Sequence, residues 1–341
     1  MKLLRNAQIW MPGYLSNRLR GNAGKGPVKR VWVSICDHYE PFWQNKDEGK
    51  ARDRVAAWRR LWPEIAKRNP DSRGCPAKYS FFYPEEEYRA PLIDQLVEMT
   101  RLGTGDVEVH IHHDGEGKQN FIDRISGYVE VLNQKHGLLR KRAGKTIFGF
   151  IHGHWALDNS RPDGRCCGLN NEISILRDLG CYADYGMPSG GSATQARMVN
   201  QIYWCTDDPE KPKSYDTGVP VSPGNFGSGD LLIIPGPFGL RWRERLLPRI
   251  ETGELAGYDL PSPYRIRRWL SLAPQIGEDL FIKLYTHGCQ ERNYGPLLEG
   301  GFDQAFQYLS AECKRRGYEL RYASAWEMYQ AVRIASLAPP A

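Results

Sequence analysis

Residues 31–40 read VWVSICDHYE, an apolar run that ends in a group of ionisable side chains. The β-branched and apolar residues of its first six positions are typical of a buried strand, which would end at Asp37. After a polar loop, apolar residues recur at helical spacing from Val55 to Ile65. A buried strand followed by an amphipathic helix is the repeating unit of a parallel sheet.

The same alternation continues along the rest of the chain. Further strands are predicted over residues 79–83, 107–113, 146–151, 182–185, 231–234, 280–286 and 320–322, and helical patterns lie between most of them. About seven strand–helix units favour one distorted (β/α) barrel with mainly parallel strands over two separate domains. The stretch 186–229 is rich in Gly, Ser, Pro and Asp and predicts a β-hairpin or loop insertion. We expect an N-terminal extension over residues 1–29, the barrel over 30–335 and a frayed tail over 336–341.

The composition is that of an ordinary globular protein. Hydrophobic residues make up 41% and charged residues 25% of the 341, which excludes a disordered chain and a coiled coil. The formal net charge of +6 is spread along the chain and predicts no nucleic-acid partner. Neither a membrane-length apolar run nor a signal-peptide core is present, so a cytoplasmic protein is expected. The eight cysteines form no CxxC pair, and neither a GxGxxG after the first strand nor a GxxxxGK[ST] motif occurs.

The placement of the eight histidines is the main functional signal. Seven of them lie in four short segments, each at the C-terminal end of a predicted strand: His38; His110, His112 and His113; His152 and His154; and His287. In α/β barrels the active site lies at that end of the strands. Because side chains alternate along a strand, His110 and His112 are expected to point to the same face. Histidines beside carboxylates suit zinc or another borderline divalent ion. Such an ion lowers the pKa of a bound water, so that hydroxide is available as a nucleophile at neutral pH.

Three of these segments resemble motifs of the polysaccharide deacetylase family, also called the NodB-homology domain. The segment that ends in Asp37 and His38 is similar to the first motif of the family, an Asp-Asp pair. In residues 108–116, His112 stands where a His-x-x-x-His motif begins, and Glu116 falls where its second histidine would be. The apolar strand that ends in His287 is similar to the last motif. The family folds as a distorted (β/α) barrel and removes acetyl groups from acetylated sugars with a divalent metal.

The resemblance implies roles for particular residues. Asp37 would be the base or a ligand, His287 would protonate the leaving amine, and Asp184 would orient a catalytic group. Because His38 and Glu116 depart from the family pattern, the metal site is either rebuilt or lost. The rebuilt ligand set would be Asp37, His110, His112 and Glu116.

Other side chains are candidates for the same barrel mouth. The polar and aromatic candidates beside the ligand set are His38, Glu40, His113, His152, His154 and Trp155. Aromatic side chains that could stack on the apolar faces of sugar rings are Phe42, Trp43 and Trp204.

These observations predict a metal-dependent hydrolase, with zinc preferred over cobalt, manganese or iron. The expected substrate is an N-acetylated sugar or glycan in surface-polysaccharide biosynthesis, and the oligomeric state is left open. One alternative is a glycoside hydrolase on the same barrel, with Asp37 and either Asp184 or Asp158 as its carboxylate pair. The other is a glycan-binding protein without catalysis that has lost its metal.

Overall fold

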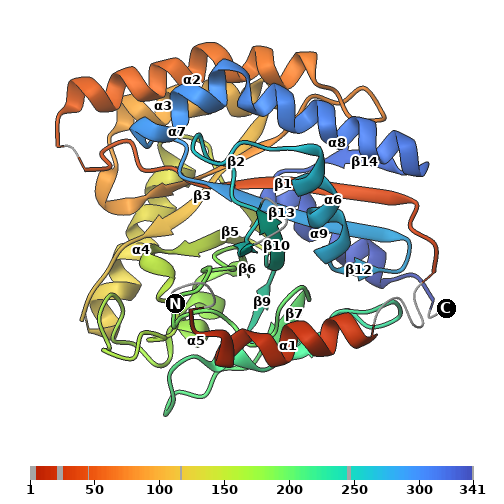
Figure 1. Cartoon of the computed structure of the whole chain (residues 1–341). Helices are drawn as coiled ribbons and strands as arrows, with labels where there is room; N and C mark the ends of the chain where they lie inside the picture. The colour runs from red at the N-terminus through yellow and green to blue at the C-terminus, as the bar shows by residue number, and fades with distance from the viewer. Residues whose placement is uncertain (1–4, 21–25, 45, 116, 244–246, 340–341) are drawn as a thin grey trace.

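The computed structural model describes residues 5–20, 26–44, 46–115, 117–243 and 247–339. Its centre is a curved parallel sheet with helices on its outer face (Figure 1). Seven strands form this sheet in the order β13-β1-β2-β3-β5-β6-β9, and every neighbouring pair is parallel. Their bounds, in chain order, are β1 Arg30–His38, β2 Tyr79–Pro84, β3 Gly105–Ile111, β5 Lys145–His152, β6 Cys181–Asp184, β9 Leu231–Ile233 and β13 Asp279–Thr286. The predicted α/β fold with about seven mainly parallel strands is confirmed.

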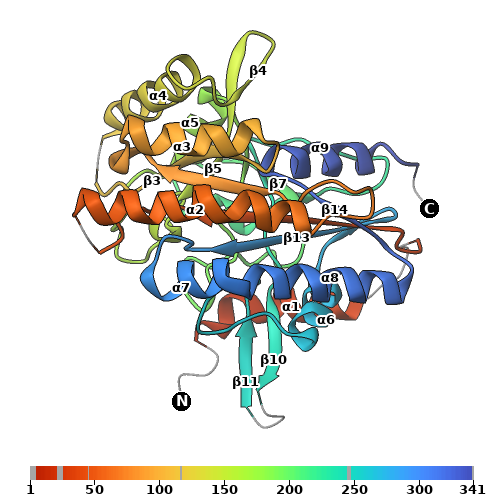
Figure 2. The same ribbon diagram turned by 90° about the horizontal axis from the view of Figure 1, so that it is seen from above.

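The helices and the short strands surround this sheet. The helices are α1 Ala7–Arg20, α2 Glu48–Arg68, α3 Ala90–Arg101, α4 Lys118–Gln134, α5 Glu172–Leu179, α6 Pro263–Leu272, α7 Glu291–Pro296, α8 Phe302–Arg316 and α9 Ala325–Ser336. The remaining strands are β4 Arg140–Arg142, β7 Tyr203–Cys205, β8 Val219–Pro220, β10 Gly239–Arg243, β11 Leu247–Glu251, β12 Gln275–Ile276 and β14 Glu319–Tyr322. Seen from above, α2, α3 and α8 lie side by side over the sheet (Figure 2). No helix among the described residues is both long and apolar enough to cross a membrane.

Alternation along the strands separates two apolar layers. On β1, Val33 and Ile35 point outward and share one core with the fully buried Trp58 and Trp62 of α2. Cys36, one position along, points inward and belongs to a second core, to which α9 contributes Met328 and Val332. Each large apolar side chain buried in these layers stabilises the fold by about 1.5–3 kcal/mol relative to an exposed one.

The barrel is distorted because β9 and β13, the two ends of this seven-strand order, do not pair among the described residues; β9 pairs with β7 and β13 with β12 instead. Irregular chain fills this gap: Leu255 donates its amide to the carbonyl of Tyr285 at 2.8 Å, and Tyr285 donates its own to Gly253 at 3.2 Å. Lys283 of β13 reaches across and donates its ammonium group to the carbonyl of Tyr185 at 2.7 Å. These contacts take the place of a regular ladder of hydrogen bonds between β9 and β13.

The predicted insertion over 186–229 contains a short antiparallel pair, β7 with β8, and β7 also pairs with β9. A second hairpin, β10–β11, was not predicted from the sequence. Helix α1 packs near its base, with the rings of Trp10 and Phe238 5.1 Å apart at 87°. The division into extension, barrel and tail stays a prediction.

Candidate functional site

The ends of β1, β3 and β13 bring several ionisable side chains to the inner face of the barrel mouth. His38 is the last residue of β1, His110 lies near the end of β3, and His287 directly follows β13. His38 points inward because it lies two positions after the inward-facing Cys36. We call His38, Glu40, His110, His112 and His287 the mouth cluster.

Close contacts hold the mouth cluster together. The ring of His38 stacks on that of His287 with centroids 4.6 Å apart and lies 5.2 Å from that of His110. Glu40 Oε1 lies 3.5 Å from Nε2 of His110 and 3.3 Å from Nε2 of His112. His110 and His112 point to the same face, as the alternation along the strand predicts, and their ring centroids are 4.7 Å apart.

Three atoms of the mouth cluster have the properties of metal ligands. His38 Nε2, His110 Nε2 and Glu40 Oε2 are buried and have no hydrogen-bond partner among the described residues. His38, Glu40 and His110 each offer a ligand atom, and these atoms lie within 4.8 Å of one another. His110 Nδ1 lies 2.7 Å from the carbonyl oxygen of Ile151. Since that oxygen can only accept, Nδ1 carries the proton and the Nε2 lone pair faces the cluster.

The charges of the cluster also suit a cation. Burial alone would raise the pKa of Glu40, but the neighbouring imidazoles of His110 and His112 hold that pKa well below its usual range. Burial, helped by the neighbouring His287 and His110, lowers the pKa of His38 well below its usual value. A carboxylate and a neutral imidazole are the forms that bind metal ions.

Glu86 is a functional candidate that the sequence analysis missed. Its carboxylate pairs with His112 Nδ1 and accepts the backbone amide of His112 at 3.3 Å. Burial would lower the pKa of His112, but hydrogen bonds to Glu40 and Glu86 raise it to about 10. Glu86 lies two residues after the end of β2, so the rule that located the histidines could have found it.

Asp37 lies on the face of β1 opposite to the mouth cluster. Its carboxylate accepts the hydroxyl of Tyr79 at 2.8 Å and the amide of Gly288 at 2.7 Å, and burial raises its pKa well above the usual range. The structure thus brings the carboxylate of Glu40, rather than that of Asp37, to the histidines. The reason is strand alternation, which separates the directions of neighbouring residues.

One further residue of the predicted site, Asp184, is not brought into the cluster. Asp184 accepts the amide of Gly186 at 3.0 Å and lies near Lys283. Lys283 lies on β13, four residues before His287, so Asp184 is deeper in the barrel than the mouth cluster. Burial raises the pKa of Asp184 to about 7. Glu116 lies outside the described residues.

Aromatic rings border the mouth cluster. The ring of Trp155 lies 5.4 Å from that of His38 and 5.6 Å from that of His287, and the ring of Trp43 lies 6.3 Å from that of His287. His154, which is exposed, lies 4.8 Å from His112 between ring centroids. Both His154 and Trp155 have a positive φ, near 54°, a strained conformation that is common at functional sites.

The other predicted stacking residues and two histidines lie elsewhere. Phe42 packs beneath the guanidinium of Arg89, and Trp204 donates its indole N–H to the carbonyl of Phe226 within the insertion. His113 and His152 form a separate buried group with Cys167 and Glu172.

Comparison with known proteins adds little to this geometry. No protein-family model and no curated protein matches the chain. Among solved structures the chain is similar to a 4-alpha-glucanotransferase from Thermococcus litoralis, with 11% identity and a TM-score of 0.45 over 89% of this chain and 40% of that one. A likeness this distant carries no argument about activity. The comparisons therefore lend no support to the resemblance to polysaccharide deacetylases, which stays a hypothesis.

Proposed function

We propose that this protein is a metal-dependent hydrolase whose cation is held by His38, Glu40 and His110. The observation that carries this proposal is the convergence of three buried ligand atoms without hydrogen-bond partners among the described residues. Burying such polar atoms unpaired costs about 1–3 kcal/mol each, which a bound cation would offset. Two imidazoles and one carboxylate suit zinc, and three protein ligands leave a coordination position open for substrate, as in catalytic zinc sites.

The side chains around this centre are suited to the hydrolysis of an amide. A divalent cation held by these residues would polarise a carbonyl and increase the acidity of water. The Nδ1 atom of His287 is buried without a partner among the described residues, and burial lowers the pKa of this imidazole, so the ring is neutral at pH 7. It can accept a proton from the attacking water and deliver it to the departing nitrogen as the C–N bond breaks. His112 stays cationic and stabilises negative charge that develops on the carbonyl oxygen.

The proposed substrate is an N-acetylated sugar or glycan, deacetylated during surface-polysaccharide biosynthesis. Trp43 and Trp155 present aromatic rings beside the mouth cluster, where a sugar could stack. A cavity of about 520 Å³, lined by Trp43, Gln290 and Arg292 among others, adjoins this side of the mouth. Its polar and aromatic lining supports a carbohydrate, as does the resemblance of three segments to the deacetylase motifs.

The test combines metal content with acetate release. Wild-type protein, Glu40→Gln and His110→Ala are loaded with zinc, their metal is counted by elemental mass spectrometry, and they are assayed on an N-acetylated oligosaccharide. Both variants are expected to lose about one equivalent of metal and the release of acetate. Asp37→Asn is the matched comparison: its carboxylate points away from the cluster, so it is expected to keep the metal.

Two results would contradict the proposal. If Glu40→Gln and His110→Ala hold as much zinc as the wild type, the mouth cluster is not a metal site. Loss of metal in Asp37→Asn alone would return the ligand role to Asp37. In a protein without a metal at the mouth, glycosidase activity or glycan binding without turnover would become the better-supported function.

A further inference from the structure

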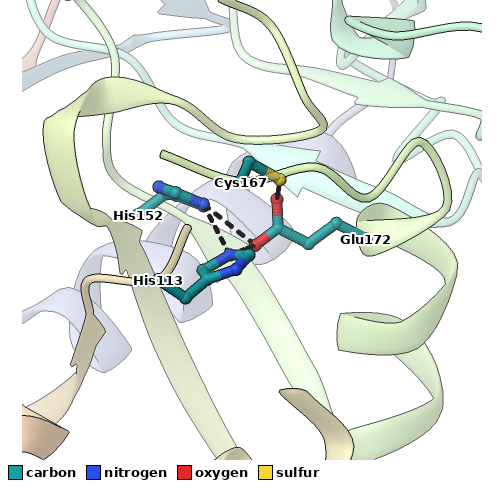
Figure 3. Close-up of side chains that lie close together, drawn as sticks. All are labelled: His113, His152, Cys167 and Glu172. Atoms are coloured by element: carbon teal, nitrogen blue, oxygen red, sulfur yellow. Dashed lines mark hydrogen bonds and ion pairs between the residues drawn. The ribbon is translucent and has the colours of Figure 1, made fainter. Parts of the chain in front are cut away.

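A second group of ligand-type side chains, drawn in Figure 3, lies on the outer side of the strands, where its two histidines pack near Phe121 and Phe150. We call it the outer cluster, and it consists of His113, His152, Cys167 and Glu172. His113 follows β3, His152 ends β5, Cys167 lies in the loop after β5, and Glu172 begins α5. All four residues are buried.

The spacing of the outer cluster is close to that of a tetrahedral metal site. Nε2 of His113 and Nε2 of His152 are 2.9 Å apart, and they lie 3.2 and 3.3 Å from Glu172 Oε1. The sulfur of Cys167 lies 3.3 Å from Glu172 Oε2. Ligands bonded to zinc at about 2.0–2.3 Å in a tetrahedron are about 3.3–3.6 Å from one another, so the atoms of His113, His152 and Glu172 are within about 0.5 Å of that spacing. The four ligand atoms all lie within 4.8 Å of one another.

The neighbouring backbone already orients these atoms. His152 Nδ1 lies 2.5 Å from the carbonyl oxygen of Gly153, which fixes the proton on Nδ1 and turns the Nε2 lone pair toward the cluster. The sulfur of Cys167 accepts the amides of Asn159 at 3.2 Å and Leu169 at 3.4 Å. Burial raises the pKa of the Cys167 thiol, and these two amide donors lower it in part; a bound cation would displace the thiol proton.

Without a cation, two protons hold this group together. Nε2 of His113 can donate to Nε2 of His152 at 2.9 Å or to Glu172 Oε1 at 3.2 Å, and the thiol of Cys167 donates to Glu172 Oε2 at 3.3 Å. A divalent cation would take the place of these protons and bind the same lone pairs. It would also balance the two negative charges of a Cys167 thiolate and a Glu172 carboxylate, so that the buried group is neutral as a whole.

We propose that His113, His152, Cys167 and Glu172 hold a divalent cation of the zinc type in a closed structural site. Four protein ligands complete a tetrahedron and leave no position for substrate, in contrast to the mouth cluster. The site would join β3, β5 and α5 through the loop that follows β5. It would also hold in place the segments that carry His112 and His154 at the mouth, because these residues are one and two positions from outer-cluster ligands.

The test uses the sulfur ligand, since His38, Glu40 and His110 supply none. Wild-type protein is loaded with cobalt(II) and its absorption is recorded, and the zinc form is measured by X-ray absorption. We expect a thiolate-to-cobalt charge-transfer band in the near ultraviolet and a sulfur scatterer at about 2.3 Å from zinc. Cys167→Ser should lose the band and one equivalent of metal.

Two control variants show whether the band arises from the outer cluster. Cys75→Ser changes an exposed cysteine and should keep the band. Glu40→Gln changes only the mouth cluster and should also keep it, so failure of the proposed activity and failure of this site are distinguishable. If Cys167→Ser does not fold, X-ray absorption of the wild type alone decides. A metal-loaded wild type without a sulfur ligand, or a band that persists in Cys167→Ser, would show that the outer cluster is only a hydrogen-bonded network.

Discussion

Replacement of Gly153 by alanine should displace His112 from the mouth cluster. A Cβ at position 153 would lie 2.2 Å from His112 Cδ2, 2.6 Å from His112 Cγ and 2.8 Å from the carbonyl oxygen of Ile111. Non-bonded carbon atoms are normally about 3.5–4.0 Å apart, so the imidazole must move by more than about 1 Å. The φ of Gly153 lies outside the left-handed region, so the effect is steric and not a backbone penalty.

The expected size of the effect follows from this displacement. Overpacking of this kind costs about 1–3 kcal/mol of unfolding free energy. In a protein of this size each kcal/mol lowers Tm by no more than ~4 °C. The contact of His112 with Glu40, now 3.3 Å, would be lost. Since a displacement of about 1 Å at an active site can cost about 100-fold in rate, we expect kcat/KM for acetate release to fall far more than stability does.

The assay compares Gly153→Ala with Gly127→Ala by thermal unfolding, zinc titration and acetate release. Gly127 lies inside α4, and a Cβ there meets no atom within 4 Å. The control should therefore gain about 0.5–1 kcal/mol from its improved helix propensity and keep its activity. An unchanged Tm and an unchanged rate in Gly153→Ala would refute the inference that the close contact confines His112.

Three further perturbations test other parts of the structure. Burial raises the pKa of Asp184 to about 7, so its protonated form stabilises the fold at low pH and this contribution is lost as the pH rises from about 4 to about 7. The side chain of Asp184→Asn does not titrate. The unfolding free energy of this variant minus that of the wild type should therefore rise across that window, by up to about 4 kcal/mol. Urea unfolding that gives the same difference at every pH would contradict this. Glu251→Gln should destabilise by about 3–5 kcal/mol, because it leaves the cation of Arg265 buried with its carboxylate partner neutralised. A matched change in an exposed ion pair, Glu98→Gln, should cost about 0–1 kcal/mol, and equal losses in the two variants would be evidence against burial as the cause. Removal of metal with a chelator should lower Tm, reversibly on addition of zinc, since a ligand at 100 times its Kd contributes about 2.7 kcal/mol; a Tm that is insensitive to both treatments would argue against bound metal.

Much of the fold could be predicted from local sequence pattern. Central strands such as β1 are covered on both faces and therefore read as continuous apolar runs, while α2 shows its buried residues at helical spacing. The hairpin β10–β11 has no comparable signal, and α1 contains Pro12 in its interior. These elements depend on contacts between distant segments, such as the packing of Trp10 on Phe238.

The sequence grouped the histidines but did not divide them. Histidines at four strand ends predicted one site at the barrel mouth, and that location stays a prediction. Neighbouring residues, however, point to opposite faces, so His112 lies in the mouth cluster and His113 in the outer cluster. His152 ends β5 in the outer cluster, whereas His154 lies beyond the strand, has a positive φ and is beside His112. A sequence pattern that groups these residues as one set cannot show that they form two sites.

The sequence by itself determined the parallel α/β architecture and the gathering of ionisable residues at one end of the sheet. Both follow from local periodicity, because side-chain burial repeats every two residues in a strand and every 3.6 in a helix. Only the tertiary structure decided that Glu40 rather than Asp37 meets His38 and His110, and that Cys167 and Glu172 join the outer histidines. Glu40 and His110 are far apart in the chain, as are His113 and Glu172, and the curvature of the sheet together with the path of its loops sets the distances between their atoms.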